Sequence, residues 1–382
     1  MFKSKFFRLD WILFISVLLI TSAGLFTMGS VVELDSYFIR QLVLILISIG
    51  VFWICSLIDW HFLKRSNIIL ILYFISIAIL LALFIVGDIA KGAQRGIDLG
   101  LFSVQPTDLV KLVLIILLAK YFTRRHTEIA RFRHIIISGL YAVIPFFLIA
   151  LQPDFGSALA IFFIWLGMIL VSGVPVKYLL MIFGGGAILG VILWNFSIAG
   201  FQLEDYQKAR IMNFLHPLED VQGAGYNAYQ AVIAVGSGGL LGKGIGYGTQ
   251  SRLRFLPEYQ TDFIFAAFAE QWGFVGIVLL LLCFGVLLGR LFTYSIRGQT
   301  NFETFFCIGV IWWFMAHLII NIGMNIGLMP ITGIPLPLMS YGGSHLLIEC
   351  AALGMAMSMS KYHKVLKQGT YDKYDNQGGF LS

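Results

Sequence analysis

Long apolar runs alternate with short polar segments along almost the whole chain. A bilayer core of about 30 Å requires roughly 20 apolar residues in a helix, and ten runs approach this length. They begin near Trp11, Phe38, Ile68, Thr107, Ile135, Gly156, Tyr178, Asp262, Phe302 and His345. The pattern predicts an all-α polytopic membrane protein with about ten transmembrane helices, which form a single integral membrane domain over residues 1–361. The polar residues 362–382 are expected to form a flexible cytoplasmic tail.

Composition and charge placement support this prediction. The chain has 382 residues, of which 59% are hydrophobic and 12% are charged, whereas soluble domains carry about 25% charged residues. A soluble globular protein is therefore excluded. The net charge of +6 does not indicate nucleic-acid binding, because the basic residues lie mostly in alternate connecting segments. This bias places both the N- and the C-terminus in the cytoplasm.

Two further features refine the expected topology. The basic start of the chain and its first apolar run also resemble a signal peptide, but the run continues to Met28, which favours a retained span. The one long segment between spans is Gly200 to Thr261, expected on the outer side before the eighth span. Its middle, Tyr226 to Val235, has weak helical periodicity and is expected to lie along the membrane interface.

Asp262 stands where the long polar segment meets the eighth apolar run. It follows Thr261 and precedes a helix that is expected to begin at Phe263. The free N–H groups and the partial positive charge at a helix N-terminus favour an ionised carboxylate. Such a carboxylate is suited to act as a general base, but aspartate is also a common helix cap. The residues alone leave both interpretations open.

Six segments in one order along the chain carry a resemblance to a known family. They are KGAQR at 91–95, QPTDLVK at 105–111, QPDFGSAL at 152–159, GAGYNAYQAVIAVGSGGLLGKG at 223–244, FLPEYQTDFIF with AEQWGFVG at 255–276, and PITGIPLPLMSYGGS at 330–344. The sequence resembles the SEDS (shape, elongation, division and sporulation) family, which polymerises bacterial cell-wall glycan. The GIPLP wording is more similar to the rod-shape branch, and a division- or sporulation-type paralogue is the alternative.

The resemblance implies a peptidoglycan glycosyltransferase that joins lipid II units into glycan strands, with undecaprenyl pyrophosphate as the leaving group. Asp262 would act as the general base toward a sugar hydroxyl, and direct attack predicts inversion at the anomeric carbon. The active site is expected on the extracytoplasmic side of the bacterial cytoplasmic membrane. The expected partners are the growing glycan strand, a class B penicillin-binding protein transpeptidase and the elongation machinery.

Further polar residues are candidates for binding the substrate. Cations near the outer surface would bind the pyrophosphate through charge-assisted hydrogen bonds. The candidate cations are Arg95, Lys111, Arg210 and Lys243. Other candidates for binding the substrate are Asp108, Asp154, Glu258 and Ser340. Three have a structural alternative: Asp108 and Lys111 as a salt bridge, and Asp154 as a helix cap. Ser340 lies in an uncharged segment rich in proline and glycine, expected to be a re-entrant or surface loop that lines the substrate groove.

No cofactor is evident from the residue pattern. The four cysteines lie in apolar runs without metal-ligand spacing. No ligand cluster for a divalent cation is apparent, and the sequence leaves open whether such an ion assists the pyrophosphate. His317 is expected to be a packed core residue. A lipid II flippase is the main rival function, and it predicts ionisable groups near the middle of the bilayer. Here the ionisable residues gather toward the outer surface, which favours the enzyme. A non-enzymatic scaffold for cell-wall enzymes is the third possibility.

Overall fold

The computed structural model describes residues 10–29, 36–86, 97–98, 103–125, 132–152, 154–195, 205–216, 224–253 and 255–378. Within these residues the chain is almost entirely helical. The helices are α2 (Trp11–Gly29), α3 (Ser36–Leu57), α4 (Phe62–Arg65), α5 (Ile68–Val86), α6 (Pro106–Arg125), α7 (Phe132–Leu151), α8 (Phe155–Val171), α9 (Val176–Asn195), α10 (Asp205–Leu215), α11 (Ala224–Ser237), α12 (Thr249–Arg252), α13 (Ile264–Arg297), α14 (Asn301–Asn325) and α15 (Gly343–Gly378).

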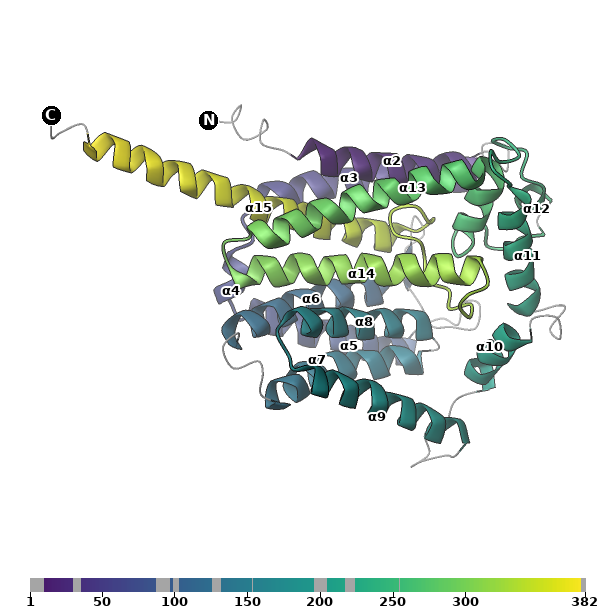
Figure 1. Cartoon of the computed structure of the whole chain (residues 1–382), viewed down its shortest axis with the longest axis horizontal. Coiled ribbons are helices and arrows are strands. Elements are labelled where there is room, and N and C mark those ends of the chain that lie inside the picture. Colours follow the sequence, from purple (N-terminus) through teal and green to yellow (C-terminus); the bar gives the residue numbers. More distant parts are fainter. Residues whose placement is uncertain are drawn as a thin grey trace.

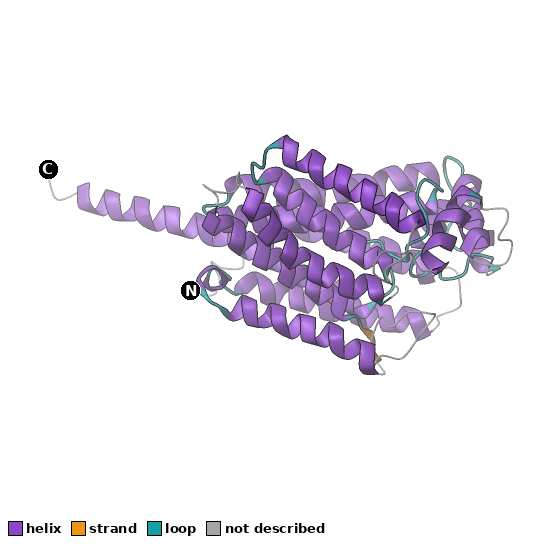
Figure 2. Ribbon diagram, turned by 90° about the horizontal axis from the view of Figure 1, so that it is seen from below, coloured by secondary structure: helices purple, strands orange, loops and turns teal. Residues whose placement is uncertain are grey.

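The long helices run side by side in one bundle (Figures 1 and 2). α2 begins and α15 ends at the same end of the bundle, while α10, α11 and α12 gather at the opposite end (Figure 1). We call these the terminal end and the loop end. Five described helices are long and apolar enough to cross a membrane: Trp11–Gly29, Tyr37–Leu57, Phe132–Leu151, Ile264–Arg297 and Asn301–Asn325. An all-helical integral membrane protein is therefore confirmed, and the count of ten spans and the cytoplasmic termini stay predictions.

α14 lies in the centre of the bundle, in contact with α6, α8 and α13. Small residues allow these helices to approach closely, as is common between membrane helices. A Cβ on Gly167 of α8 would fall within 2.0 Å of the Trp312 ring, and one on Gly309 of α14 within 2.6 Å of Ile115. Around this core, α15 packs on α3 and α13 packs on α2. The outer faces of α3, α5 and α13 expose large apolar side chains, as a lipid-facing surface requires.

α13 is broken at Gly273, which has φ 64° and ψ −166°. The N–H groups freed by the break donate to the preceding loop, from Phe274 to Gly239 O at 2.9 Å and from Val275 to Leu240 O at 3.1 Å. Irregular backbone at a membrane span persists only where such partners exist. The sequence prediction treated this run as one uninterrupted span, so the break corrects it.

Three other expectations differ in detail. α13 begins at Ile264 with Phe263 as its N-cap residue, so Asp262 lies one residue before the cap. α15 continues to Gly378, beyond residue 361 where the membrane domain was expected to end, and the flexibility and cytoplasmic placement of the tail stay predictions. A two-residue antiparallel ladder joins β1 (Ile97–Asp98) to β2 (Ser103–Val104), which the all-α prediction did not include.

Candidate functional site at the loop end

The segment from Pro330 to Gly342 is non-helical, as its prolines and glycines predicted, and it folds back into the loop end of the bundle. Buried backbone groups need partners, and three side chains supply them. His317 Nδ1 lies 3.2 Å from Pro335 O, Asn321 Nδ2 donates to Ile334 O at 2.8 Å, and Glu349 accepts from the N–H of Leu338 at 2.8 Å. We call this segment the re-entrant loop, because protein covers it from several sides.

Asp262 is held through its main chain by side chains of α14. Its carbonyl accepts hydrogen bonds from Asn321 Nδ2 at 3.0 Å and Asn325 Nδ2 at 3.1 Å. Asn325 Oδ1 also accepts from the N–H of Ala266 at 3.2 Å, in the first turn of α13. The Asp262 side chain itself is half-buried. Side chains from α14 therefore fix the main-chain position of the candidate base.

The residues just before Asp262 are fixed by the re-entrant loop. Ser340 Oγ donates to Thr261 O at 2.7 Å and accepts from the N–H of Leu336 at 2.8 Å. The N–H of Tyr341 donates to Gln260 O at 2.7 Å. Ser340 was predicted to line a substrate groove, and the structure instead places it fully buried at this junction.

Two strained residues flank the same junction. Glu258 has φ 51° and Leu338 has φ 61°, and they are the non-glycine residues with positive φ in the described part of the chain. Such conformations persist only where the surroundings enforce them, and they cluster at functional sites. Glu258 Oε2 accepts from Thr261 Oγ1 at 3.3 Å, so this binding candidate braces the turn that leads to Asp262.

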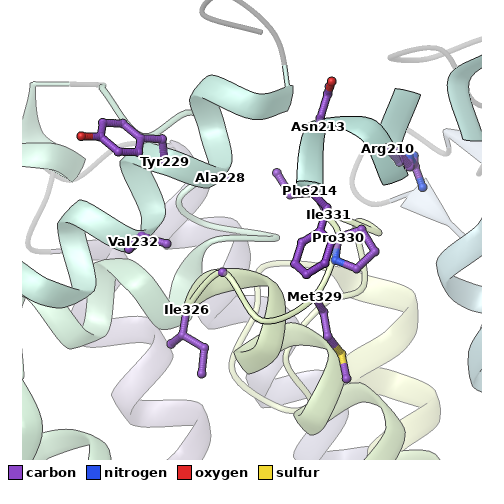
Figure 3. A pocket seen from close by; sticks show the side chains of 11 residues that line it. Arg210, Asn213, Phe214, Ala228, Tyr229, Val232, Ile326, Met329, Pro330 and Ile331 are labelled. Atoms are coloured by element: carbon purple, nitrogen blue, oxygen red, sulfur yellow. The ribbon is translucent and has the colours of Figure 1, made fainter. Parts of the chain in front are cut away.

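An apolar pocket of about 260 Å³ lies between α10, α11 and the start of the re-entrant loop (Figure 3). It is lined by Arg210, Asn213 and Phe214 of α10, Ala228, Tyr229 and Val232 of α11, and Ile326, Gly327, Met329, Pro330 and Ile331. Ile331 also packs against the apolar cluster that contains Phe263, the neighbour of Asp262. Arg210 Nη1 donates to Thr332 O at 3.5 Å, so a guanidinium stands at this apolar pocket.

Asp108 and Lys111 form an ion pair at 3.0 Å, with side chains only 2% and 1% exposed. Lys111 Nζ and Trp313 Nε1, both donors, lie 3.3 and 3.2 Å from His317 Nε2. Nε2 must therefore accept, so the proton of a neutral imidazole resides on Nδ1, which faces Pro335 O. His317 is thus a packed, hydrogen-bonded residue as predicted, and Lys111 is enclosed within the bundle.

Lys243 is engaged by a carboxylate that the sequence interpretation overlooked. Its Nζ lies 2.8 Å from Oε1 of Glu270, a fully buried residue of α13. Glu270 also accepts from Thr249 Oγ1 and from the N–H of Gln250, both at 3.0 Å. This network ties α12 to α13, and it gives Lys243 a structural role beside the predicted role in binding pyrophosphate.

Asp154 takes the cap position that was one of its two interpretations. Its Oδ1 accepts from the N–H of Ser157 at 3.3 Å, and its Oδ2 accepts from Gln105 Nε2 at 3.1 Å. A Cβ on Gly156 would lie 2.8 Å from Thr332 O, so this helix start packs on the re-entrant loop. Arg95 lies outside the described residues.

Glu270 and Glu349 are the acidic residues that sequence reasoning missed at this end. A lone carboxylate within an apolar run is itself a signal, because an ionisable group in a membrane span usually has a role. Among the described residues, no group of three or more His, Cys, Asp or Glu side chains is arranged to hold a metal ion.

Residues 3–365 match a family of cell cycle proteins that includes FtsW, RodA and SpoVE. This chain belongs to the SEDS family. A SEDS relative, "Peptidoglycan glycosyltransferase MrdB" of Escherichia coli K12, is 38% identical over 297 residues, which cover 78% of this chain and 79% of the relative.

Two other SEDS relatives extend the comparison. "Stage V sporulation protein E" of Bacillus subtilis is 34% identical over 368 residues, which cover 93% of this chain and 98% of the relative. A solved structure described as "Structural coordination of polymerization and crosslinking by a peptidoglycan synthase complex" superimposes with a TM-score of 0.79 at 29% identity, covering 93% of this chain and 98% of that one. Because different branches match at similar identity, the comparisons assign the family and leave the branch open.

Proposed function

We propose that this SEDS protein is a peptidoglycan glycosyltransferase that polymerises lipid II at the outer face of the cytoplasmic membrane, with Asp262 as the general base. The observation that carries the proposal is the placement of Asp262. Its carbonyl is anchored by Asn321 and Asn325, and the preceding residue, Thr261, is anchored by Ser340 of the re-entrant loop. Its side chain is half-buried, and Ile331, which lines the apolar pocket, packs on the cluster that contains the neighbouring Phe263. The names of the relatives supply the reaction class.

In the proposed reaction, the Asp262 carboxylate removes the proton from the attacking sugar hydroxyl. The hydroxyl oxygen forms a bond to the anomeric carbon as the bond from that carbon to the pyrophosphate oxygen breaks. Undecaprenyl pyrophosphate leaves with the bonding electron pair, and the anomeric carbon is inverted. The leaving group already carries negative charge, so cations rather than a protonating acid are needed to stabilise it.

Among the predicted phosphate-binding cations that the structure describes, Arg210 is the one that lines the pocket. The Lys111 side chain, by contrast, is only 1% exposed inside the bundle. We propose that the pocket holds the first isoprenoid units of the lipid carrier and that Arg210 contacts its phosphate. The sequence GIPLP at residues 333–337 supports the rod-shape branch. The proposed partners are therefore the elongation machinery and a class B penicillin-binding protein transpeptidase.

Asp262→Asn tests the assignment, because it preserves side-chain shape and removes the base. We expect the purified variant to keep the wild-type melting temperature in detergent and to lose at least about 100-fold in polymerisation of labelled lipid II. Asp59→Asn is the matched control, since Asp59 lies at the terminal end with 52% of its side chain exposed, and it should give wild-type product. Wild-type product from Asp262→Asn would refute the assignment.

The same assay separates the enzyme from a flippase. Polymerisation needs no closed membrane, so glycan product from detergent-solubilised wild-type protein supports the enzyme, whereas a transporter would form none. The test is necessary because the structure weakens one argument made from the sequence. Asp108, Lys111, Glu270 and Glu349 are all buried inside the bundle, although they lie near the helix ends that face the loop end.

A further inference from the structure

Glu349 is a buried carboxylate with no part in the proposed reaction. It lies in the second turn of α15 with 0% of its surface exposed. Its Oε2 accepts a hydrogen bond of 2.8 Å from the N–H of Leu338, eleven residues earlier in the re-entrant loop. An acidic side chain is rarely enclosed in this way without a role.

The residue that Glu349 holds is the strained one. Leu338 is fully buried with φ 61°, a conformation that a residue with a Cβ rarely adopts and that needs enforcement from its surroundings. The carboxylate satisfies the N–H of Leu338 in that conformation. Without an acceptor, the buried N–H would be unsatisfied, and the strained turn would lose a contact that maintains it.

The strained turn is connected to Asp262 by two short links. Two residues after Leu338, Ser340 Oγ donates to Thr261 O at 2.7 Å. The next residue, Tyr341, donates its N–H to Gln260 O at 2.7 Å. A change in the backbone at Leu338 therefore shifts both hydrogen bonds that fix the two residues immediately before the candidate base.

We infer that Glu349 is a positioning residue that fixes Asp262 through Leu338 and Ser340, and that it acts as a hydrogen-bond acceptor rather than as a negative charge. The donor it meets is a neutral backbone N–H, so a neutral oxygen of the same geometry suffices. This inference rests on the proposed function of Asp262. It concerns how accurately the base is held, and small displacements of a reacting group reduce turnover more than substrate binding.

The experiment compares Glu349→Leu with Glu349→Gln in the lipid II polymerisation assay. Leucine removes the acceptor, so kcat should fall at least about tenfold while KM stays within about twofold. Glutamine retains an acceptor oxygen, so it should restore kcat to within about threefold of the wild type. The pH dependence of kcat should be the same in Glu349→Gln and the wild type, because the base is unchanged.

Glu303→Leu is the matched control. Glu303 is a buried carboxylate of α14 at the terminal end, where it accepts from the N–H of Gln299 and from Thr300 Oγ1. Its loss should lower the melting temperature without the fall in kcat. An equal fall in kcat for Glu303→Leu would mean that any buried defect reduces activity, and it would overturn the inference.

Two other outcomes would also overturn it: wild-type kcat in a folded Glu349→Leu variant, or a Glu349→Gln variant as impaired as Glu349→Leu. If Glu349→Leu does not fold, Ser340→Ala provides the test. This variant removes the hydrogen bond to Thr261 O, so it should lower kcat with KM unchanged. A wild-type kcat in Ser340→Ala would refute the inference. Failure of the proposed function gives a different result, since wild-type protein itself would then yield no glycan.

Discussion

At the terminal end of the bundle, the ion pair between Asp10 and Arg290 joins the start of α2 to α13 and stays partly exposed. Asp10 accepts from Tyr294 and Arg290, and these hydrogen bonds lower its pKa even though partial burial opposes the shift. At the loop end, the Asp108–Lys111 pair is enclosed almost completely. A partly exposed pair tolerates the loss of one partner better than an enclosed pair does, because water can solvate the charge that is left.

The two ends also differ in which groups are held by hydrogen bonds. At the terminal end, side-chain carboxylates are the anchored groups, as in Glu303 bound by His61 at 2.9 Å. At the loop end, the anchored groups include the backbone carbonyls of Gln260, Thr261 and Asp262. These contacts fix the position of the proposed base through the main chain. Such anchoring suits the proposed role, which requires an accurately placed carboxylate.

The largest expected effect is on the enclosed pair. Lys111→Met leaves Asp108 charged and buried, so we expect unfolding free energy to fall by about 3 to 5 kcal/mol. Combining it with Asp108→Asn should recover much of that loss. Arg290→Met at the terminal end, where the Asp10–Arg290 pair is partly exposed, should lower the unfolding free energy by only about 1 kcal/mol. Denaturation in detergent measures the unfolding free energy of the wild type and the three variants. Equal losses of stability in Lys111→Met and Arg290→Met would contradict the comparison.

The next effect concerns the close packing of α2 against the re-entrant loop. A Cβ on Gly24 would lie 2.2 Å from Met339 O, so Gly24→Ala must displace the loop. We expect a loss of about 1 to 3 kcal/mol in stability and a fall in polymerisation. Gly50→Ala is the matched control, because no atom outside the adjacent backbone of its own helix lies within 4 Å of its Cβ position. If both variants behave alike, the loop is less constrained than the contacts imply.

The smallest expected effect is a pH dependence at the terminal end. The hydrogen bond to Glu303 raises the pKa of His61 from 6.5 to about 9; desolvation opposes the rise, and the bond to Asp59 adds to it. A raised pKa stabilises the protein fully below pH 6.5, and this stabilisation is lost as pH rises to about 9. Because 30% of the His61 side chain is exposed, we expect only about 1 to 2 kcal/mol.

His61→Gln should remove this pH dependence while leaving polymerisation unchanged, since His61 lies far along the bundle from Asp262. Melting temperatures between pH 6 and 9.5 provide the measurement. A wild-type stability that rises with pH over this range would show that the sign is wrong. A loss of polymerisation in His61→Gln would show that the two ends do not act independently.

Much of the fold could be predicted because apolar length is a local property. The starts of the long helices fall within a few residues of the predicted runs, as with α6, expected near Thr107 and found from Pro106. The irregular segment from Pro330 was also predictable, because its prolines and glycines exclude a regular helix. The break at Gly273 was not, since its freed N–H groups bond to a loop more than thirty residues earlier.

The sequence by itself determined that this is a helical membrane protein of the SEDS type, and that Asp262 stands at the junction of a long polar loop and an apolar helix. The length of an apolar run and the sequence of a motif are properties of consecutive residues, so no contact between distant parts of the chain is needed to recognise them. Only the tertiary structure decided which partners hold Asp262. Asn321, Asn325, Ser340 and Glu349 come from α14, α15 and the re-entrant loop, and their convergence depends on how the helices pack.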